Sequence, residues 1–514
     1  MRTPSRLAAA IAGLLAGAAG LALAELAAGV LPGAPSPVTE IGAFLIAHQP
    51  AGAEQLVVGL FGTNDKLALN LVVAAAALAI AAGLGVLART GTQPRFGLAL
   101  GGFAALGLLA LGASFGDELA DGTLGLLSLG ASLLVTWWVL STLLRIASAP
   151  EIARAAEMPD WSRRRFMGTS LGIGLAAVAG TTVGRVLLDS RAQETADIGP
   201  LPAPVATASP LPTGATVDVA GITPLVVPNG DFYRIDTQLL TPHLKAATWQ
   251  LQVTGMVDHP LTFTYEQLLA LPLHEEYVTI QCVSNEVGGE LVGNALWRGV
   301  SLRQVLDQAG IQPGATQIVG KAFDGWTAGF PTDWLMGSER EALIAVAMNG
   351  EPLPPAHGYP ARLIVPGLYG YVSATKWLTE IQLTTWEAFN GYWVPLGWSK
   401  LGPIKTASRI DTPHGGNSVA AGSVPVAGMA WAPDRGVRAV ELQVDDGAWQ
   451  PAELSTPISS TTWVQWLVRW QASAGSHQLR VRATDATGAV QIEAPHEPPP
   501  DGATGYHTIT VSVT

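Results

Sequence analysis

The stretch YVTIQCVSN at residues 277–285 decides the fold of this chain, and it contains the only cysteine, Cys282. The β-branched residues before Cys282 predict a strand, and the polar residues after it, followed by two glycines, predict a loop. A strand that ends in such a loop is where mixed α/β folds expose reactive groups to a cleft. A lone cysteine is otherwise a small buried hydrophobic residue, so the motif by itself allows both a reactive thiol and a core position.

A second stretch, HGYPARLIVPGLYGYVSATKW at residues 357–377, gathers the basic side chains of His357, Arg362 and Lys376 among glycine and proline turns. Basic side chains and backbone N–H groups presented together suit a phosphate group. The glycines that follow Cys282 have neither the GxGxxG nor the GxxxxGK[ST] spacing. The sequence therefore predicts a phosphate-bearing ligand but no nucleotide-binding loop.

These two stretches, together with NALWRGVSL at residues 294–302, resemble the sulfite oxidase family of molybdopterin-dependent oxidoreductases. The resemblance covers about residues 230–514 and includes an immunoglobulin-like domain similar to the family's dimerisation domain. It implies molybdenum with one molybdopterin as the cofactor and Cys282 as the thiolate ligand of the metal, a role that a soft thiolate suits. It also implies two-electron oxygen-atom transfer on a small molecule, and a possible homodimer through the C-terminal domain.

The resemblance implies roles for further residues of this chain. Three match catalytic positions of the family, namely Tyr392, Arg234 and Arg435. The residues that match cofactor contacts are Phe232, Tyr233, Arg234, Asp236, Asp324, His357, Arg362, Ala374, Thr375 and Lys376. A simple turn at Asp324 and an aromatic core position at Tyr392 are the alternatives for those two residues.

The loop after Cys282 departs from the family pattern. Sulfite oxidases typically place an arginine there, whereas this chain has Ser284, Asn285 and Glu286. A dianion such as sulfite needs a cationic pocket, which a glutamate opposes. Arg298 is a possible replacement cation. Two substrate classes, sulfite and sulfoxides, are therefore expected, and the alternative function is a non-catalytic cell-surface binding or assembly module that retains the family fold.

Composition excludes several functions. Charged residues make up 13% of the chain, against about 25% in soluble domains, and the mean hydropathy is +0.31, so a sizeable part of the chain is expected in lipid. A net charge of −12 leaves no excess of basic residues for nucleic acid. One cysteine excludes an intrachain disulfide and a cysteine-held iron–sulfur cluster. His48 is the only histidine before residue 243, so we expect no haem in the N-terminal half, and no NAD site is predicted.

Five nearly uncharged segments are long enough to cross a bilayer, at residues 7–31, 67–88, 96–115, 124–147 and 166–188. Arginines flank them on one side, at residues 2, 6, 89, 95 and 163–165, whereas the charged residues of the intervening loops, at 32–66 and 116–123, are acidic apart from Lys66. The positive-inside rule then predicts a multi-pass protein of the plasma (inner) membrane with a cytoplasmic N-terminus. The catalytic part lies outside the cytoplasm in this prediction, and a separate carrier exchanges its electrons.

The segment SRRRFM at residues 162–167 resembles a twin-arginine export signal, with an ordinary positive-inside anchor as the alternative. The fold class expected is an all-α transmembrane region, an α+β sulfite-oxidase-type domain and an all-β immunoglobulin-like sandwich. The predicted boundaries are 1–150 for four transmembrane helices, 151–190 for the twin-arginine-like segment and a fifth helix, 191–230 for a Pro/Ala-rich linker, 231–410 for the molybdopterin-binding domain and 411–514 for the sandwich.

Overall fold

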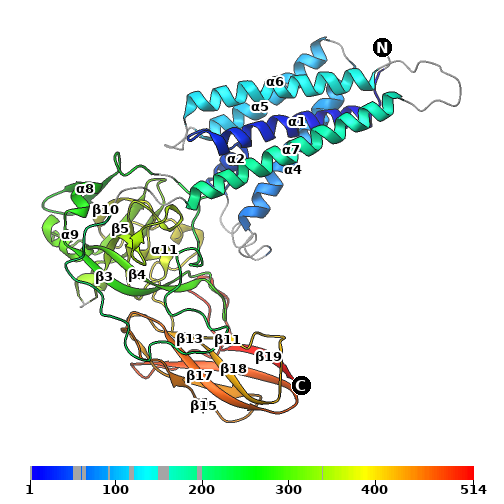
Figure 1. Ribbon diagram of the computed structural model, residues 1–514. Coiled ribbons are helices and arrows are strands. Elements are labelled where there is room, and N and C mark those ends of the chain that lie inside the picture. Colours follow the sequence, from blue (N-terminus) through cyan, green and yellow to red (C-terminus); the bar gives the residue numbers. More distant parts are fainter. Residues whose placement is uncertain are drawn as a thin grey trace. The chain divides into compact units, whose positions relative to one another are not determined.

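The computed structural model describes residues 3–49, 60, 65–90, 93–114, 121–148, 161–193, 200–242, 244–337 and 340–514. These residues form two compact units, which are Met1–Glu194 with Thr237–His243 and Thr195–Asp236 with Leu244–Thr514 (Figure 1). Arg2, on which the predicted orientation partly rests, and residues 151–160 of the predicted fifth-helix region lie outside the described residues.

The first unit is a bundle of helices. They are α1 (Arg6–Val30), α2 (Pro37–Ala47), α4 (Asp65–Ala88), α5 (Gln93–Ser114), α6 (Gly122–Ala147) and α7 (Trp161–Gln193). Small residues let α1 pack closely on its neighbours, since a Cβ atom at Gly29 would lie 2.5 Å from the carbonyl oxygen of Gly184 on α7. All the described helices of this unit except α2 are long and apolar enough to cross a membrane, judged by length and composition.

Helix α2 lies within the segment 32–66, which separates the first two predicted membrane spans. Ser36 caps it by accepting a hydrogen bond from the N–H of Thr39, and Pro37 begins its first turn. The α2 helix packs against α4 and α5. Its apolar composition was visible, but its length is too short for the spanning pattern by which the other helices were found.

Glu25 is the fully buried carboxylate of α1. Its Oε2 forms an ion pair with Nε of Arg185 on α7 at 3.0 Å, and it accepts hydrogen bonds from Ser36 Oγ and the N–H of Val38. A buried carboxylate that is both paired and hydrogen-bonded joins helices rather than standing as an isolated charge. Glu25 therefore ties α1, α7 and the start of α2 together.

The second unit begins with residues 200–236, and here the predicted linker is wrong. Leu225 and Val227 are buried in the core, the N–H of Val227 donates to Asn294 O at 2.9 Å, and the N–H of Val205 donates to Leu273 O at 2.8 Å. The composition is rich in proline, which needs no partner for an N–H group, so the remaining donors can be satisfied along strand edges. A few spaced apolar side chains are enough to anchor the segment on the core.

The α+β part of this unit has two sheets. One has the order β2-β1-β10-β5-β6, formed by Leu261–Thr264, Gln250–Gly255, Leu378–Thr384, Gln317–Ala322 and Thr327–Pro331. The other has the order β3-β4-β7-β8, with β9 paired to β7, formed by Leu273–Gln281, Val292–Ser301, Leu343–Met348, Glu351–Pro352 and Arg362–Ile364. The short helices are α8 (Tyr265–Leu269), α9 (Leu302–Ala309), α10 (Thr332–Met336) and α11 (Gly370–Ser373).

The C-terminal part is two sheets that share one apolar core. Their orders are β11-β13-β17-β16, from Ala407–Thr412, Gly422–Trp431, Val464–Ala472 and Glu453–Leu454, and β12-β19-β18-β14-β15, from Ser418–Val419, His507–Val513, Gly475–Asp485, Val437–Val444 and Gln450–Pro451. Alternating residues of β18 are buried, as the period-two pattern predicts. The first strand starts at residue 407, four residues before the predicted boundary of 411, because Ala407 already pairs with Trp431.

His507 joins the first and last strands of this part. Its Nδ1 accepts a hydrogen bond from the N–H of Ile410 at 2.9 Å, and burial, followed by the charge of Arg409, lowers the pKa of His507 to about 4. An unfolded histidine titrates near pH 6.5, so between about pH 6.5 and pH 4 the unfolded chain binds the extra proton. The folded state is therefore expected to lose stability as the pH falls from about 6.5 to about 4, and to keep its full stability above about pH 6.5.

We expect the His507→Asn variant to lose much of this pH dependence, because an amide oxygen can accept the same hydrogen bond without binding a proton. Urea unfolding at pH 7 and pH 4.5 measures it, and the drop in unfolding free energy is expected to be smaller than in the wild type by about 2 kcal/mol. The control is His496→Asn, at an exposed histidine. An unchanged drop in His507→Asn would contradict the assignment.

Candidate functional site

Cys282 follows directly on β3 and is buried, with 8% of its surface exposed. Its N–H donates to Leu291 O at 2.9 Å, and its carbonyl oxygen accepts from the N–H of Asn285 at 3.1 Å. The side-chain oxygen of Asn285 accepts from the N–H of Leu291 at 2.7 Å. The predicted strand end and loop are confirmed, and the loop at residues 283–291 closes on itself so that the thiol stays at its base.

The C-terminal sheets hold this loop from the other side. Arg409 on β11 forms an ion pair with Asp411 at 2.6 Å and donates to Gly289 O at 2.7 Å. Gly288 has a φ of 79°, and a Cβ atom there would overlap the ring of His507. The conformation of the loop after Cys282 therefore depends on Arg409 and His507, which come more than a hundred positions later in the chain.

Replacing Gly288 with alanine is expected to destabilise the protein by about 2 to 4 kcal/mol, since the left-handed backbone conformation and the overlap with His507 both oppose a side chain. Thermal unfolding measures this. Gly416→Ala is the matched control, because Gly416 has the same φ of 79° and open space around it. That variant keeps only the backbone cost of about 1 kcal/mol. Equal destabilisation of the two variants would show that the overlap with His507 contributes nothing to the effect of Gly288→Ala.

Three basic side chains of the second motif lie together and are buried. They are His357 in a short 3-10 helix (Pro355–His357), Arg362 on β9 and Lys376 after α11. Arg362 Nη1 donates to His357 O at 3.1 Å, and Lys376 Nζ donates to Ala356 O and to Asp236, both at 3.0 Å. The structure thus brings together the three basic residues that the sequence predicted to share a site.

The pKa values of all three groups are lowered, because burial disfavours their charged forms. Burial, and next the charge of Lys376, lowers the pKa of His357 to about 3. Burial lowers the pKa of Arg362 to about 10 and that of Lys376 to about 8, although Asp236 opposes the shift of Lys376. Buried cations that weaken one another in this way favour an anionic ligand, which would restore their charged forms.

Orphaned polar atoms point the same way. Among the described residues, Nδ1 of His357, Nε of Arg362 and Oγ1 of Thr375 are buried without a hydrogen-bond partner. Each such group costs about 1–3 kcal/mol, so several in one place need an explanation. Thr375 is also tightly enclosed, because a Cβ atom at Gly320 would lie 2.5 Å from its Oγ1. The three atoms fit a ligand with several hydrogen-bonding groups, such as a pterin with a phosphate.

Tyr233 connects this basic group with the cysteine. Burial raises its pKa well above the usual range, the charge at Cys282 raises it further, and Arg362 opposes the rise. Its ring lies 5.2 Å from that of Phe232, which meets the ring of His357 edge-on at 5.7 Å. The thiol, the aromatic pair and the basic group therefore belong to one site.

The other predicted residues lie around this site with different contacts. Arg234 is about a third exposed and pairs with Asp236 at 3.0 Å, while Ala374 offers its carbonyl oxygen to Arg362 at 3.5 Å. Asp324 accepts a hydrogen bond from the N–H of Trp326, which is the turn that was its alternative. The N–H of Tyr392 donates to Thr327 O, and the ring of Tyr392, which is partly exposed, meets Trp393 edge-on.

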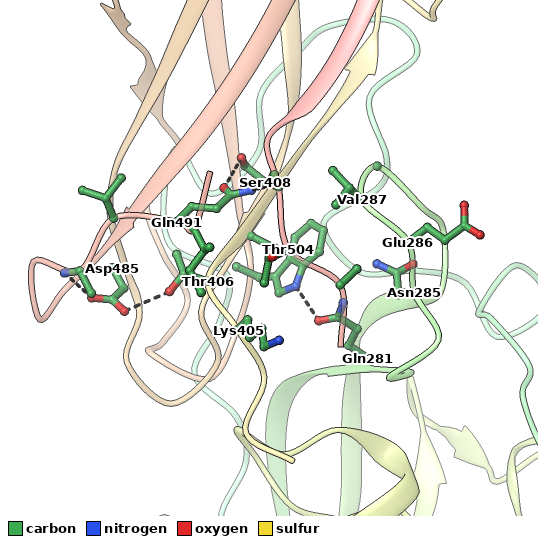
Figure 2. Close-up of a pocket in the computed structure, with 18 of the residues that line it drawn as sticks. Gln281, Asn285, Glu286, Val287, Lys405, Thr406, Ser408, Asp485, Gln491 and Thr504 are labelled. Atoms are coloured by element: carbon green, nitrogen blue, oxygen red, sulfur yellow. Dashed lines mark hydrogen bonds between the residues drawn. The ribbon is translucent and has the colours of Figure 1, made fainter. Parts of the chain in front are cut away.

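A cavity of about 240 Å³ lies between the cysteine loop and the C-terminal sheets. Gln281, Asn285 and Lys405 line it (Figure 2). Arg435 is a further lining residue. Arg435 pairs with Asp485 at 2.9 Å, and Lys405 pairs with Asp501 at 2.9 Å. Burial would raise the pKa of Asp485, but hydrogen bonds from Thr487, Arg435 and Thr406 outweigh it and hold that pKa at about 2. Each of these two cations is thus neutralised by a neighbouring carboxylate.

Sequence reasoning missed three residues of this region, Tyr369, Gln281 and Trp431. Burial raises the pKa of Tyr369 to about 12, and both Cys282 and Arg435 act on its charge, so the phenol is within electrostatic reach of the thiol and of the cavity. Gln281 accepts a hydrogen bond from the indole N–H of Trp431 at 2.8 Å. Tyr369 stands inside the quoted second motif, which was the available signal, whereas nothing local marks Trp431.

Comparison with known proteins identifies the family. The profile described as "Oxidoreductase molybdopterin binding domain" matches residues 238–393. Mitochondrial sulfite oxidase of Mus musculus is 30% identical over 315 residues, covering 52% of this chain and 57% of that protein. The uncharacterized oxidoreductase YuiH of Bacillus subtilis (strain 168) is 38% identical over 154 residues, covering 30% of this chain and 74% of YuiH.

The chain belongs to the sulfite oxidase family of molybdopterin oxidoreductases. NADH nitrate reductase of Spinacia oleracea is a further relative, 32% identical over 177 residues, which are 29% of this chain and 19% of that enzyme. The chain spans only about half the length of the mitochondrial sulfite oxidases that it matches. As a member of this family it is a molybdenum-cofactor-dependent oxidoreductase, which favours the enzyme over the non-catalytic binding module.

Proposed function

We propose that this protein is a membrane-anchored, extracytoplasmic oxidoreductase that transfers an oxygen atom to or from a small molecule in a two-electron reaction. The five long apolar helices and the arginines on one side of them support the anchor and its orientation. The family supports the redox chemistry. Electrons pass between the site and a separate carrier in this proposal, and haem, iron–sulfur clusters and NAD take no part in this chain.

The observation that carries the proposal is the meeting of one buried thiol with several orphaned polar atoms. Cys282 would hold the molybdenum, since thiolates suit this soft coordination. Arg362, His357 and Thr375 would bind the pterin and its phosphate through the atoms that are without partners among the described residues, with Lys376 beside them. The cofactor supplies the two-electron chemistry when bound, and the protein binds and orients it.

The remaining predicted residues are proposed to surround the cofactor and the substrate. Phe232 and Tyr233 form its aromatic wall, and Asp236 positions Lys376. Arg435 and Arg234 are proposed to orient the substrate, and Tyr392 and Asp324 are proposed contacts from the family pattern. Among the tyrosines, Tyr369 adds a phenol within electrostatic reach of both Cys282 and Arg435.

The charge of the cavity supports an uncharged substrate such as a sulfoxide over sulfite. Arg435 and Lys405 are each paired with a carboxylate, and Glu286 adds a negative charge at the rim. Figure 2 shows the Glu286 carboxylate turned away from Gln281 and Lys405, toward the outside of the cavity. A doubly charged anion would approach this rim against a like charge and would find its cations already neutralised.

The first test is metal and pterin analysis of the full chain made with the molybdenum-cofactor pathway intact. About one molybdenum and one pterin per chain are expected, and their absence from folded protein would refute the proposal. We then expect kcat/KM for an alkyl sulfoxide to exceed that for sulfite by at least about tenfold, a difference of about 1.4 kcal/mol. A preference for sulfite would overturn the substrate assignment while leaving the cofactor intact.

The orientation and the oligomeric state are separate parts of the proposal. Reporter fusions after Ala147 and after Thr514 are expected to read as cytoplasmic and extracytoplasmic, respectively, because α6 ends on the side of the arginines. Both fusions on one side would contradict it. The C-terminal sheets are proposed to form a homodimer, which light scattering of the purified chain tests.

A further inference from the structure

The helical unit contains a cavity of about 140 Å³ that the oxidoreductase site does not use. It lies among α1, α2, α4, α5 and α6, and small residues make room for it. On α1 these are Gly17, Gly20 and Ala24, and the facing positions on α4 are Ala77 and Ala81. A close-packed bundle would be expected to fill this space with larger side chains, so the hollow is a feature of the sequence.

Ser132 and Glu40 are among the polar residues that line this cavity, together with Ser128 and Thr136. Ser132 on α6 is only 9% exposed, and its Oγ has no hydrogen-bond partner among the described residues. Glu40 on α2, 8% exposed, lines the same cavity. In hydrocarbon an unsatisfied hydroxyl is costly, because no water is there to replace the missing partner. The Ser132 hydroxyl therefore points to a ligand that brings a hydrogen-bond acceptor into the cavity.

The depth of the cavity suits a molecule that arrives through lipid. Ser132 follows the first residue of α6, Gly122, by ten positions. At about 1.5 Å per residue this is about 15 Å along the helix, or half of a hydrocarbon core of about 30 Å. Polar residues that line a cavity at that depth are typical of a binding site within the membrane.

We propose that this cavity binds the ring of a lipid-soluble quinone, with Ser132 Oγ donating a hydrogen bond to one of its carbonyl oxygens and Glu40 beside the ring. The inference rests on the membrane placement proposed above. A quinone is uncharged, apolar and flat, and its carbonyl oxygens are acceptors, which matches the walls and the orphaned hydroxyl. An acyl chain of a phospholipid would fill the hollow but would leave Ser132 without a partner.

The redox chemistry proposed for the Cys282 site supports a quinone as the ligand. The five apolar segments contain no histidine and no cysteine, so they offer no side-chain ligands for haem or an iron–sulfur cluster. A quinone and its quinol differ by two electrons and two protons, and two electrons is the number that oxygen-atom transfer requires. The proposal concerns binding of the quinone, and the measurement below does not depend on turnover.

Photolabelling of the wild-type chain is the direct test. Full-length protein in phospholipid nanodiscs is irradiated with an azido derivative of ubiquinone, and the labelled peptides are identified by mass spectrometry. We expect the label on α2 or α6, within Pro37–Ala47 or Gly122–Ala147, and we expect excess ubiquinone-1 to displace it. Label that is spread over lipid-facing residues and is not displaced would overturn the proposal.

Matched variants give the second test, with ubiquinone-1 binding measured by equilibrium titration in the same nanodiscs. Ser132→Leu fills the cavity and is expected to weaken binding by at least about tenfold, whereas Ser132→Ala removes only one hydrogen bond and is expected to weaken it by about threefold to tenfold. Gly130→Leu adds the same side chain two residues away, where a Cβ atom meets open space, and is expected to bind like the wild type.

Two outcomes refute the proposal. Binding by Ser132→Leu at wild-type strength would show that the cavity is not the site. No quinone binding by the wild type, together with a phospholipid that native mass spectrometry finds in the wild type and not in Ser132→Leu, would assign the cavity to lipid. All variants are also made with Cys282→Ser, where quinone binding is expected unchanged, so a failure of the molybdenum site cannot be mistaken for a failure of the quinone site.

Discussion

Replacing Cys282 with serine is expected to remove molybdenum from the protein and to lower turnover by at least about a thousandfold, which corresponds to about 4 kcal/mol of transition-state stabilisation. The reason is chemical, because a serine hydroxyl is a harder and far less acidic ligand than a thiol. The fold is expected to persist, since hydrogen bonds of the backbone and of the Asn285 side chain hold the loop at residues 282–291. Metal analysis and steady-state kinetics measure the two effects.

The matched control for this prediction is Ser284→Ala, two positions along the same loop. It changes one side-chain hydroxyl and leaves the thiol in place, so molybdenum content and turnover are expected to stay within about twofold of the wild type. Thermal unfolding of both variants checks that neither result reflects misfolding. A Cys282→Ser protein that retains its molybdenum and its activity would remove Cys282 from the proposed metal site.

Replacing Arg362 with glutamine is expected to lower the pterin content by about 10-fold to 100-fold, because hydrogen bonds from a charged donor to a phosphate are lost. The protein without cofactor is expected to behave differently. There the change removes a buried charge whose Nε has no partner among the described residues, and the amide can still donate to the carbonyl oxygen of His357 or Ala374. The unfolding free energy of the cofactor-free protein is therefore expected to stay within about 1 kcal/mol of the wild type.

Arg298→Gln is the control for the charge itself. Arg298 on β4 pairs with Glu275 on β3 at 2.7 Å, which balances its charge, so its loss is expected to leave the pterin content unchanged. This pairing also explains why Arg298 is a poor substitute for the arginine missing after Cys282. Equal loss of pterin in the Arg298 and Arg362 variants would show that the effect is not specific to the proposed site.

The basic group illustrates what a sequence motif predicts well. His357, Arg362 and Lys376 fall within twenty positions of one another, and turns at the intervening glycines and prolines bring them together, so local pattern and resemblance agree with the structure. Asp324 and Tyr392 illustrate the limit of such matching. Asp324 forms a turn, and the partly exposed ring of Tyr392 meets Trp393, and neither contact by itself assigns a role, because a single matched residue carries little information about its surroundings.

The Pro-rich segment shows a different limit. Its composition is that of a tether, and composition was the basis for that prediction. The segment packs because Thr223 donates its N–H to Asp411, Val217 donates to Gln465, and Leu225 lies in the core. Each of these contacts joins positions nearly two hundred residues apart or more, and no window of the sequence contains both partners.

The sequence by itself determined the order of the parts, the apolar segments long enough for a membrane, the alternating strands of the C-terminal part and the family to which the cysteine belongs. These are local properties, since hydrophobic period, length and motif are each contained in a short window. Only the tertiary structure decided what surrounds the cysteine. The His507 contact with Gly288, the cavity with its paired Arg435, the reach of Tyr369 and the hollow beside Ser132 all depend on packing between distant segments, which local propensities do not encode.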